Sequence, residues 1–204
     1  MQQLKCKDLR AGDIMLKWNS RDLLAQGIHL LEKWSGKVNS QIVHAGVMFD
    51  SVYIVEASAR GIIANDLRVK DASYGYSVYR PRNTNLGQGA GTCAKVMFDI
   101  HQTSGSLKYS VPGAFGSLFG GPGAAKTQTQ MDQILDRILS GKGHPFFCSQ
   151  FVVYVYQFAG EQCGISGKSL FDTADGKVSP SFLASLLTKS PNFAEAGYVM
   201  PNER

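Results

Sequence analysis

The sequence predicts an α+β domain in which helices flank an antiparallel sheet. Residues 42–57 are rich in Val, Ile, Phe and Tyr and are broken near Asp50-Ser51, a pattern typical of a β-hairpin. Residues 21–34 and 127–140 each carry apolar side chains at helical spacing. The chain has 204 residues, the usual length of one domain, so we predict a single domain over residues 1–204.

The next elements follow from short local patterns. Residues 11–16 predict a turn that leads into a short strand, and residues 61–63 and 76–79 are two further strand candidates. Apolar side chains at helical spacing predict a helix over residues 92–103. Residues 110–126 are rich in Gly, Ala, Pro and Phe, and they predict a long loop inserted into the domain.

The last part of the chain contains one ambiguous segment. Residues 148–158 are β-branched and aromatic, which favours a strand, but their length and the following Gly160 also suit a buried helix. Ser179 and Pro180 predict the start of a helix, as its N-cap and its first-turn proline. Residues 198–200 predict a final strand.

Composition restricts the classes of function. Hydrophobic residues make up 44% of the chain and charged residues 18%, as in globular domains. No apolar stretch reaches the roughly 18 residues that a membrane span needs, and the N-terminus lacks the apolar region of a signal peptide. We therefore expect no transmembrane segment and a cytoplasmic location. The 21 basic residues outnumber the 16 acidic ones, but they are scattered, which disfavours a nucleic-acid-binding protein.

Cysteine and histidine usage argues against a disulfide framework and against a metal centre. The four cysteines include no Cys-x-x-Cys pair, and the four histidines are not at ligand spacing. A glycine-rich stretch at 120–127 resembles a phosphate-binding loop, but Ala125 replaces the glycine before the lysine and Pro122 interrupts it. We predict no metal and no cofactor.

His44 and Glu56 are the first candidate pair for catalysis. His44 is the only ionisable group in an apolar strand, and Glu56 lies in the strand that follows. If the hairpin turns through residues 49–51, His44 lies directly opposite Glu56 on the same face; a two-residue turn would put them on opposite faces. A carboxylate in that position fixes the imidazole tautomer and stabilises the imidazolium. Taken singly, each residue would be an ordinary core histidine or a solvated carboxylate.

Cys148 is the candidate nucleophile. If residues 148–158 form a helix, Cys148 lies at its N-terminus, where the helix dipole and the free N–H groups favour a thiolate and can hold an oxyanion. The alternative is a buried structural cysteine. Ser149 lacks the glycine-flanked turn of a serine nucleophile. The other cysteines have no polar partner near them in the sequence: Cys6, Cys93 and Cys163.

Four short motifs occur in a fixed order along the chain. They are Ala11-Gly12-Asp13-Ile14, Val43-His44-Ala45-Gly46-Val47, Val55-Glu56-Ala57 and Phe147-Cys148-Ser149-Gln150-Phe151. Together they resemble the circularly permuted branch of the NlpC-type papain-like superfamily. This branch includes the YiiX-like amidases and, more distantly, the lecithin:retinol acyltransferase-like proteins. The resemblance extends over most of residues 9–200.

The resemblance implies a permuted papain-like fold, with an antiparallel sheet or partial barrel flanked by helices and with the nucleophile at a helix N-terminus. It implies Cys148 as the nucleophile, His44 as the base and Glu56 as the residue that orients the base. It also implies that Tyr109 lies near the active site and assists the substrate or the oxyanion. Ser149, which follows the nucleophile, is a second candidate for substrate or oxyanion support.

These residues predict a cysteine hydrolase that cleaves amide bonds through an acyl-enzyme intermediate and needs no metal or cofactor. The resemblance implies peptide or isopeptide bonds of peptidoglycan as the substrate, and a net charge of +5 suits an anionic wall. Without a signal peptide, such an enzyme would reach the periplasm of a target cell through a specialised secretion system, as an antibacterial effector with an immunity protein as partner. Recycling of wall fragments in the cytoplasm is the other route.

Two other functions remain open. The first is acyl transfer or lipid deacylation of the lecithin:retinol acyltransferase-like type, in which the apolar residues 112–119 would contact lipid. The second is a binding module on the same fold that uses no triad chemistry. The presence of all three polar residues disfavours the second.

Overall fold

The computed structural model describes residues 2–18, 42–58, 61–70, 72–103, 148–171 and 178–202. Within these ranges the chain forms a mixed α+β fold around one seven-stranded sheet, which confirms the predicted class. The strands are β1 (Gln3–Leu4), β2 (Ile14–Trp18), β3 (Ile42–Met48), β4 (Tyr53–Ser58), β5 (Gly61–Asp66), β6 (Tyr76–Pro81) and β7 (Phe193–Val199). The helices are η1 (Cys6–Asp8), α2 (Thr84–Thr103), α5 (Cys148–Gln162), α6 (Gly167–Leu170) and α7 (Pro180–Lys189).

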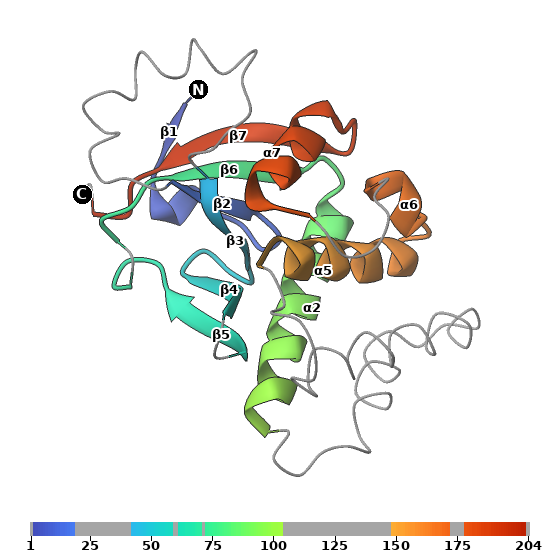
Figure 1. The fold of residues 1–204 in the computed structure, drawn as a ribbon, viewed down its shortest axis with the longest axis horizontal. Coiled ribbons are helices and arrows are strands. Elements are labelled where there is room, and N and C mark those ends of the chain that lie inside the picture. The colour runs from blue at the N-terminus through green and yellow to red at the C-terminus, as the bar shows by residue number, and fades with distance from the viewer. Residues whose placement is uncertain are drawn as a thin grey trace.

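The strand order in the sheet is β1-β7-β6-β2-β3-β4-β5. All neighbouring strands are antiparallel except β1, which pairs in parallel with β7. Figure 1 shows β1 beside β7 on the side of the molecule far from α6. The strands β3, β4 and β5 follow one another along the chain and form one half of the sheet, next to the central β2.

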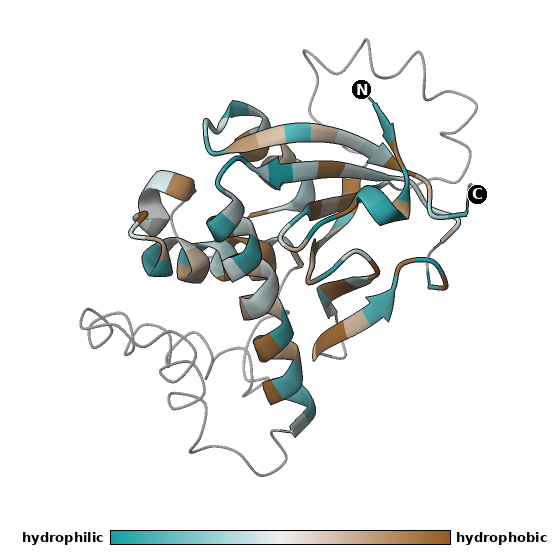
Figure 2. Cartoon of the chain, turned by 180° about the vertical axis from the view of Figure 1, so that it is seen from behind, coloured by the Kyte–Doolittle hydropathy of each residue, from teal (hydrophilic) through white to brown (hydrophobic). Residues whose placement is uncertain are grey.

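The core follows from the alternation of side chains along the strands. Ile14 and Leu16 of β2 belong to the larger cluster of buried residues, which α2, α5 and α7 complete, whereas Met15 belongs to a smaller cluster on the other face. In Figure 2, hydrophilic and hydrophobic residues alternate along the turns of α2, as expected for a helix with one buried side. The helices α2 and α5 pack against each other as well as against the sheet (Figure 1).

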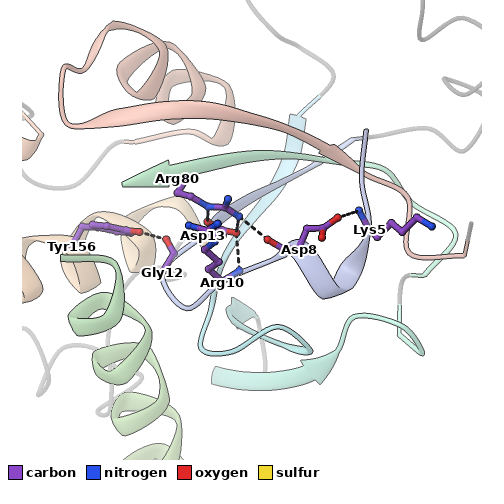
Figure 3. A network of polar contacts seen from close by, with 7 residues as sticks. All are labelled: Lys5, Asp8, Arg10, Gly12, Asp13, Arg80 and Tyr156. Atoms are coloured by element: carbon purple, nitrogen blue, oxygen red, sulfur yellow. Dashed lines mark hydrogen bonds and ion pairs between the residues drawn. The ribbon is translucent and has the colours of Figure 1, made fainter. Parts of the chain in front are cut away.

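A buried ion pair holds the turn before β2. The carboxylate of Asp13 is completely buried and accepts two hydrogen bonds from the guanidinium of Arg80, at 2.7 and 2.6 Å. It also accepts the backbone N–H of Arg10 at 2.9 Å (Figure 3). Because every partner of this carboxylate is a backbone group or an arginine, the pair is a structural link between β2 and β6.

The same turn holds both long helices against the sheet. Gly12 has a φ of +83°, and a Cβ at this position would lie 2.2 Å from the carbonyl oxygen of Gly87 in α2, so only glycine fits there. The hydroxyl of Tyr156 in α5 donates a hydrogen bond to the carbonyl of Gly12 (Figure 3). This contact fixes the position of α5, and therefore of Cys148 at its first residue, relative to the sheet.

Several predicted elements are present with different bounds. The helix predicted from residue 92 begins at Thr84, and the strand predicted at 198–200 begins at Phe193. Three glycines in the first half of α2 weaken its local helical signal: Gly87, Gly89 and Gly91. Gly87 and Gly91 lie where the helix approaches the turn at Ala11 and Gly12 closely.

The ambiguous segment from Cys148 is a helix, so packing overrides the strand propensity of its residues. Helix α7 begins as predicted, because Ser179 accepts the N–H of Phe182 at 3.1 Å and Pro180 occupies the first turn. The helices predicted at 21–34 and 127–140 and the loop predicted at 110–126 lie outside the described residues.

Candidate active site

The hairpin that carries His44 and Glu56 is confirmed, but its predicted register is wrong. β3 and β4 pair Val47 with Val55 and Met48 with Ile54. Continued along the strands, this register places Glu56 opposite Gly46 instead of opposite His44. The imidazole and the carboxylate are still on the same face, as diagonal neighbours two residues apart.

The turn explains the difference in register. The side chain of Asp50 accepts the backbone N–H groups of Val52 and Tyr53, each at 2.7 Å, so Asp50 is the first residue of the turn and not its centre. Phe49 and Tyr53 then close the hairpin, with a backbone hydrogen bond of 3.1 Å and rings stacked 5.5 Å apart. The turn therefore spans residues 50–52, one residue later than predicted.

Gly46 provides the space that the diagonal contact needs. A Cβ on Gly46 would lie 2.8 Å from Cγ of Glu56 and 2.7 Å from Cδ1 of Ile54. Because no side chain occupies this position, Glu56 can lie across β3 toward His44. Its carboxylate is buried, with 4% of the side chain exposed.

His44 follows a β-bulge that sets its direction. Lys17 pairs with His44 and Trp18 pairs with Ile42, so Val43 is an additional residue on β3 between the two pairs. Nε2 of His44 lies 3.1 Å from Oε1 of Glu56, and 26% of the His44 side chain is exposed. This is the distance of an ion pair, although the ring N–H is not aligned closely enough with Oε1 for a strict hydrogen bond.

Cys148 completes the cluster. It is the first residue of α5, which packs against β3 and β4, and its thiol is in hydrogen-bonding contact with the imidazole of His44. Since Nε2 of the ring faces Glu56, the nitrogen left for the thiol is Nδ1. The structure thus brings together Cys148, His44 and Glu56, which are far apart in the sequence.

The electrostatics of the cluster favour a protonated imidazole. Burial alone lowers the pKa of His44, but the contacts with Cys148 and Glu56 outweigh burial and raise the pKa to about 10. At neutral pH the ring is then a cation between a thiol and a carboxylate. A cation in contact with a thiol favours the thiolate, and so does the N-terminus of a helix.

The other three cysteines are in different surroundings. Burial raises the pKa of Cys93, which is fully enclosed, and that of Cys163. Burial also raises the pKa of Cys6, against an opposing effect of Arg68. The thiol form is therefore favoured at all three positions, whereas Cys148 differs from them in its contact with His44.

Asn65 is a site residue that the sequence analysis missed. Its side-chain amide, on β5, donates a hydrogen bond of 2.8 Å to Oε2 of Glu56. Asn65 lies beyond the strand predicted at 61–63, because β5 extends to Asp66, and polar residues are common at such sheet edges. Only the pairing of β4 with β5 shows that Asn65 and Glu56 meet.

The side chain of Ser149 is directed into the core. Its side chain is completely buried, and its hydroxyl donates a hydrogen bond to the carbonyl of Val178, ahead of α7. The hydroxyl therefore links the first turn of α5 to the residue before Ser179, and support of a substrate or an oxyanion by Ser149 stays a prediction. Tyr109, the other candidate for this support, lies outside the described residues.

The described residues contain neither a metal-binding cluster nor a membrane-spanning helix. Within that part of the chain, no three His, Cys, Asp or Glu side chains are grouped so as to hold a metal ion. Nor does any described helix have the length and apolar character to cross a membrane.

Comparisons of the chain with protein-family models, curated proteins and solved structures find no match.

Proposed function

We propose that this protein is a cysteine hydrolase that cleaves amide bonds. One observation carries the proposal. His44 lies between a buried carboxylate, 3.1 Å from its Nε2, and a cysteine thiol at the first residue of a helix. A nucleophile, a base and a residue that orients the base are the three components of this chemistry.

In the first half of the reaction, the Cys148 thiolate attacks the carbonyl carbon of the amide and an Sγ–C bond forms. The N–H groups of the first turn of α5 have no partner within the helix, and the N–H of Cys148 is placed to stabilise the oxyanion. The imidazolium of His44 then donates its proton to the leaving nitrogen as the C–N bond breaks. The amine leaves and a thioester remains on Cys148.

In the second half, His44 acts as a base. Once Sγ is acylated it carries no negative charge, so one of the causes that raise the pKa of His44 is removed. The neutral ring can then take a proton from water, whose oxygen attacks the thioester. The bond between Sγ and the acyl carbon then breaks, the carboxylic acid leaves with the hydroxyl from water, and the proton stays on His44, which restores the resting thiolate–imidazolium pair. Throughout the cycle, Glu56 holds the ring and stabilises its charged form.

We also propose a permuted papain-like fold and a peptidoglycan substrate. The order along the chain, with His44 on a strand before Cys148 on a helix, supports the permuted papain-like arrangement that the sequence motifs suggested. Among amide substrates we propose the peptide or isopeptide bonds of peptidoglycan, supported by that resemblance and by a net charge of +5 that attracts an anionic polymer.

The proposal is tested by incubating the purified protein with peptidoglycan sacculi and measuring new free amino groups and the masses of released fragments. We expect the wild-type protein to release fragments, and Cys148→Ala and His44→Ala to release none. Cys163→Ser is the matched control, because it removes a thiol just beyond the other end of α5, and it should retain the activity.

Two results would contradict the proposal. Full release of fragments by Cys148→Ala would show that the thiol is not the nucleophile. No release from peptidoglycan, together with release of fatty acid from phospholipid vesicles, would replace amide hydrolysis by lipid deacylation at the same cysteine.

A further inference from the structure

We propose that Asn65 is a positioning residue of this site, which holds Glu56 so that one carboxylate oxygen stays directed at His44. The inference rests on the proposed function, because it assigns a role within the same cluster. Asn65 acts through Glu56, to which its side chain donates a hydrogen bond.

The two oxygens of Glu56 have different partners. Oε2 accepts the Asn65 amide at 2.8 Å, and Oε1 lies 3.1 Å from Nε2 of His44. Among the described residues Oε1 has no hydrogen-bond partner, although it is fully buried, so the ion-pair contact with His44 is what compensates it. An amide N–H can only donate, so it selects Oε2 as its acceptor and leaves Oε1 for the ring.

The rotation of the Glu56 carboxylate is the freedom that Asn65 removes. The terminal torsion of a glutamate has a broad, roughly two-fold energy profile, so packing alone defines it poorly. With Gly46 opposite, there is no Cβ on β3 to limit the rotation. The amide of Asn65 is therefore the contact that fixes the carboxylate plane, and the alignment of Oε1 with His44 depends on it.

The position of Asn65 in the sheet also favours this role over a purely structural one. Asn65 pairs with Ile54, and Glu56 pairs with Ile63, so the two polar side chains are diagonal neighbours on one face. The two strands are already paired from Tyr53 and Asp66 to Ser58 and Gly61. The side-chain contact is thus not needed to hold β5 on β4.

The test compares Asn65→Leu, which keeps the size of the side chain and removes the donor, with the wild-type protein. Two quantities are measured: the midpoint of the His44 ring titration by nuclear magnetic resonance, and the rate at which iodoacetamide alkylates Cys148 at pH 7. We expect the midpoint to move to lower pH and the rate to fall about tenfold, by analogy with the loss of a partner that orients a metal-bound histidine. Asp66→Asn, a change at the next residue of β5, should leave both quantities unchanged.

A double-mutant cycle separates positioning from general destabilisation. If Asn65 acts through Glu56, then Asn65→Leu should change neither quantity further in a Glu56→Ala background. Equal effects in both backgrounds would overturn the inference, and so would a His44 midpoint that Asn65→Leu leaves at the wild-type value. If Asn65→Leu does not fold, Asn65→Ser is used in its place, since its hydroxyl is too short to reach Oε2.

Failure of the inference and failure of the proposed function give different results. A wild-type protein that releases nothing from any amide substrate contradicts the hydrolase proposal, but the His44 titration still reports whether Asn65 acts on the ring. A wild-type protein that hydrolyses amides, with Asn65→Leu equal to it in both quantities, contradicts the role of Asn65 alone.

Discussion

The chain buries two carboxylates in its described residues, Asp13 and Glu56, and their surroundings differ in kind. Asp13 is compensated by the guanidinium of Arg80 through two hydrogen bonds and by a backbone N–H of Arg10. Glu56 has a neutral amide on one oxygen and a titratable imidazole on the other.

The difference in partners indicates a structural role for Asp13 and a chemical role for Glu56. Arg80 stays charged at any pH the protein meets, so the link at Asp13 does not change during a reaction. His44 can gain and lose a proton, so the contact at Glu56 changes strength with the state of the ring. A buried carboxylate with a permanent cation stabilises the fold, whereas one with a histidine is placed to modulate a proton transfer.

The largest expected effect is on stability, at Asp13. Asp13→Asn leaves the partly buried Arg80 without its counter-charge, and breaking such a pair costs about 3–5 kcal/mol in the free energy of unfolding. Urea denaturation measures the loss. Asp66→Asn is the matched control, because it breaks the more exposed pair with Arg68 and should cost far less stability than Asp13→Asn does. Similar losses in both variants would contradict the structural role of Asp13.

Glu56→Gln should affect the reactivity of Cys148 more than the stability of the fold, the opposite of what we expect for Asp13→Asn. The substitution keeps the shape of the side chain and removes the charge that helps to raise the pKa of His44, so the pKa of His44 should fall. The rate of Cys148 alkylation at pH 7 should fall roughly 10- to 100-fold. Urea denaturation should show a smaller loss of stability than Asp13→Asn does. An unchanged alkylation rate would remove Glu56 from the proposed machinery.

Gly46→Ala tests the space beside Glu56. The new Cβ would lie 2.8 Å from Cγ of Glu56, so the carboxylate has to move and the alkylation rate should fall several-fold. Overpacking at this position should also lower the free energy of unfolding by about 1–3 kcal/mol. Gly89→Ala in α2 meets only Ala159, at 3.5 Å, and should change neither quantity for the worse.

The smallest expected effect on reactivity is at Ser149. Ser149→Ala leaves the carbonyl of Val178 without its donor in the core, which should cost about 1–2 kcal/mol in the free energy of unfolding. Alkylation of Cys148 and release of fragments from peptidoglycan should stay at wild-type levels. A large loss of activity without a loss of stability would restore Ser149 as an oxyanion donor.

Residue chemistry along the chain singled out His44, Glu56 and Cys148 as candidates, and the resemblance carried by the ordered motifs joined them into one predicted site. Details of their contact were not predictable. The register depended on whether Asp50 is the first or the central residue of a turn, which its side-chain hydrogen bonds decide. The contact of Asn65 with Glu56 depends on the pairing of β4 with β5. No local pattern in the sequence indicates that pairing.

The measurement that tests the central claim most directly is the alkylation of Cys148 by iodoacetamide across pH, with peptide mapping, in the wild type and in His44→Ala. The account predicts selective labelling of Cys148 at pH values well below those at which ordinary thiols react, with Cys6, Cys93 and Cys163 slower. A further change in rate is expected as His44 loses its proton, at a pKa of about 10. Both features should disappear in His44→Ala. Slow labelling of all four cysteines, unaffected by His44, would contradict an activated cysteine–histidine pair.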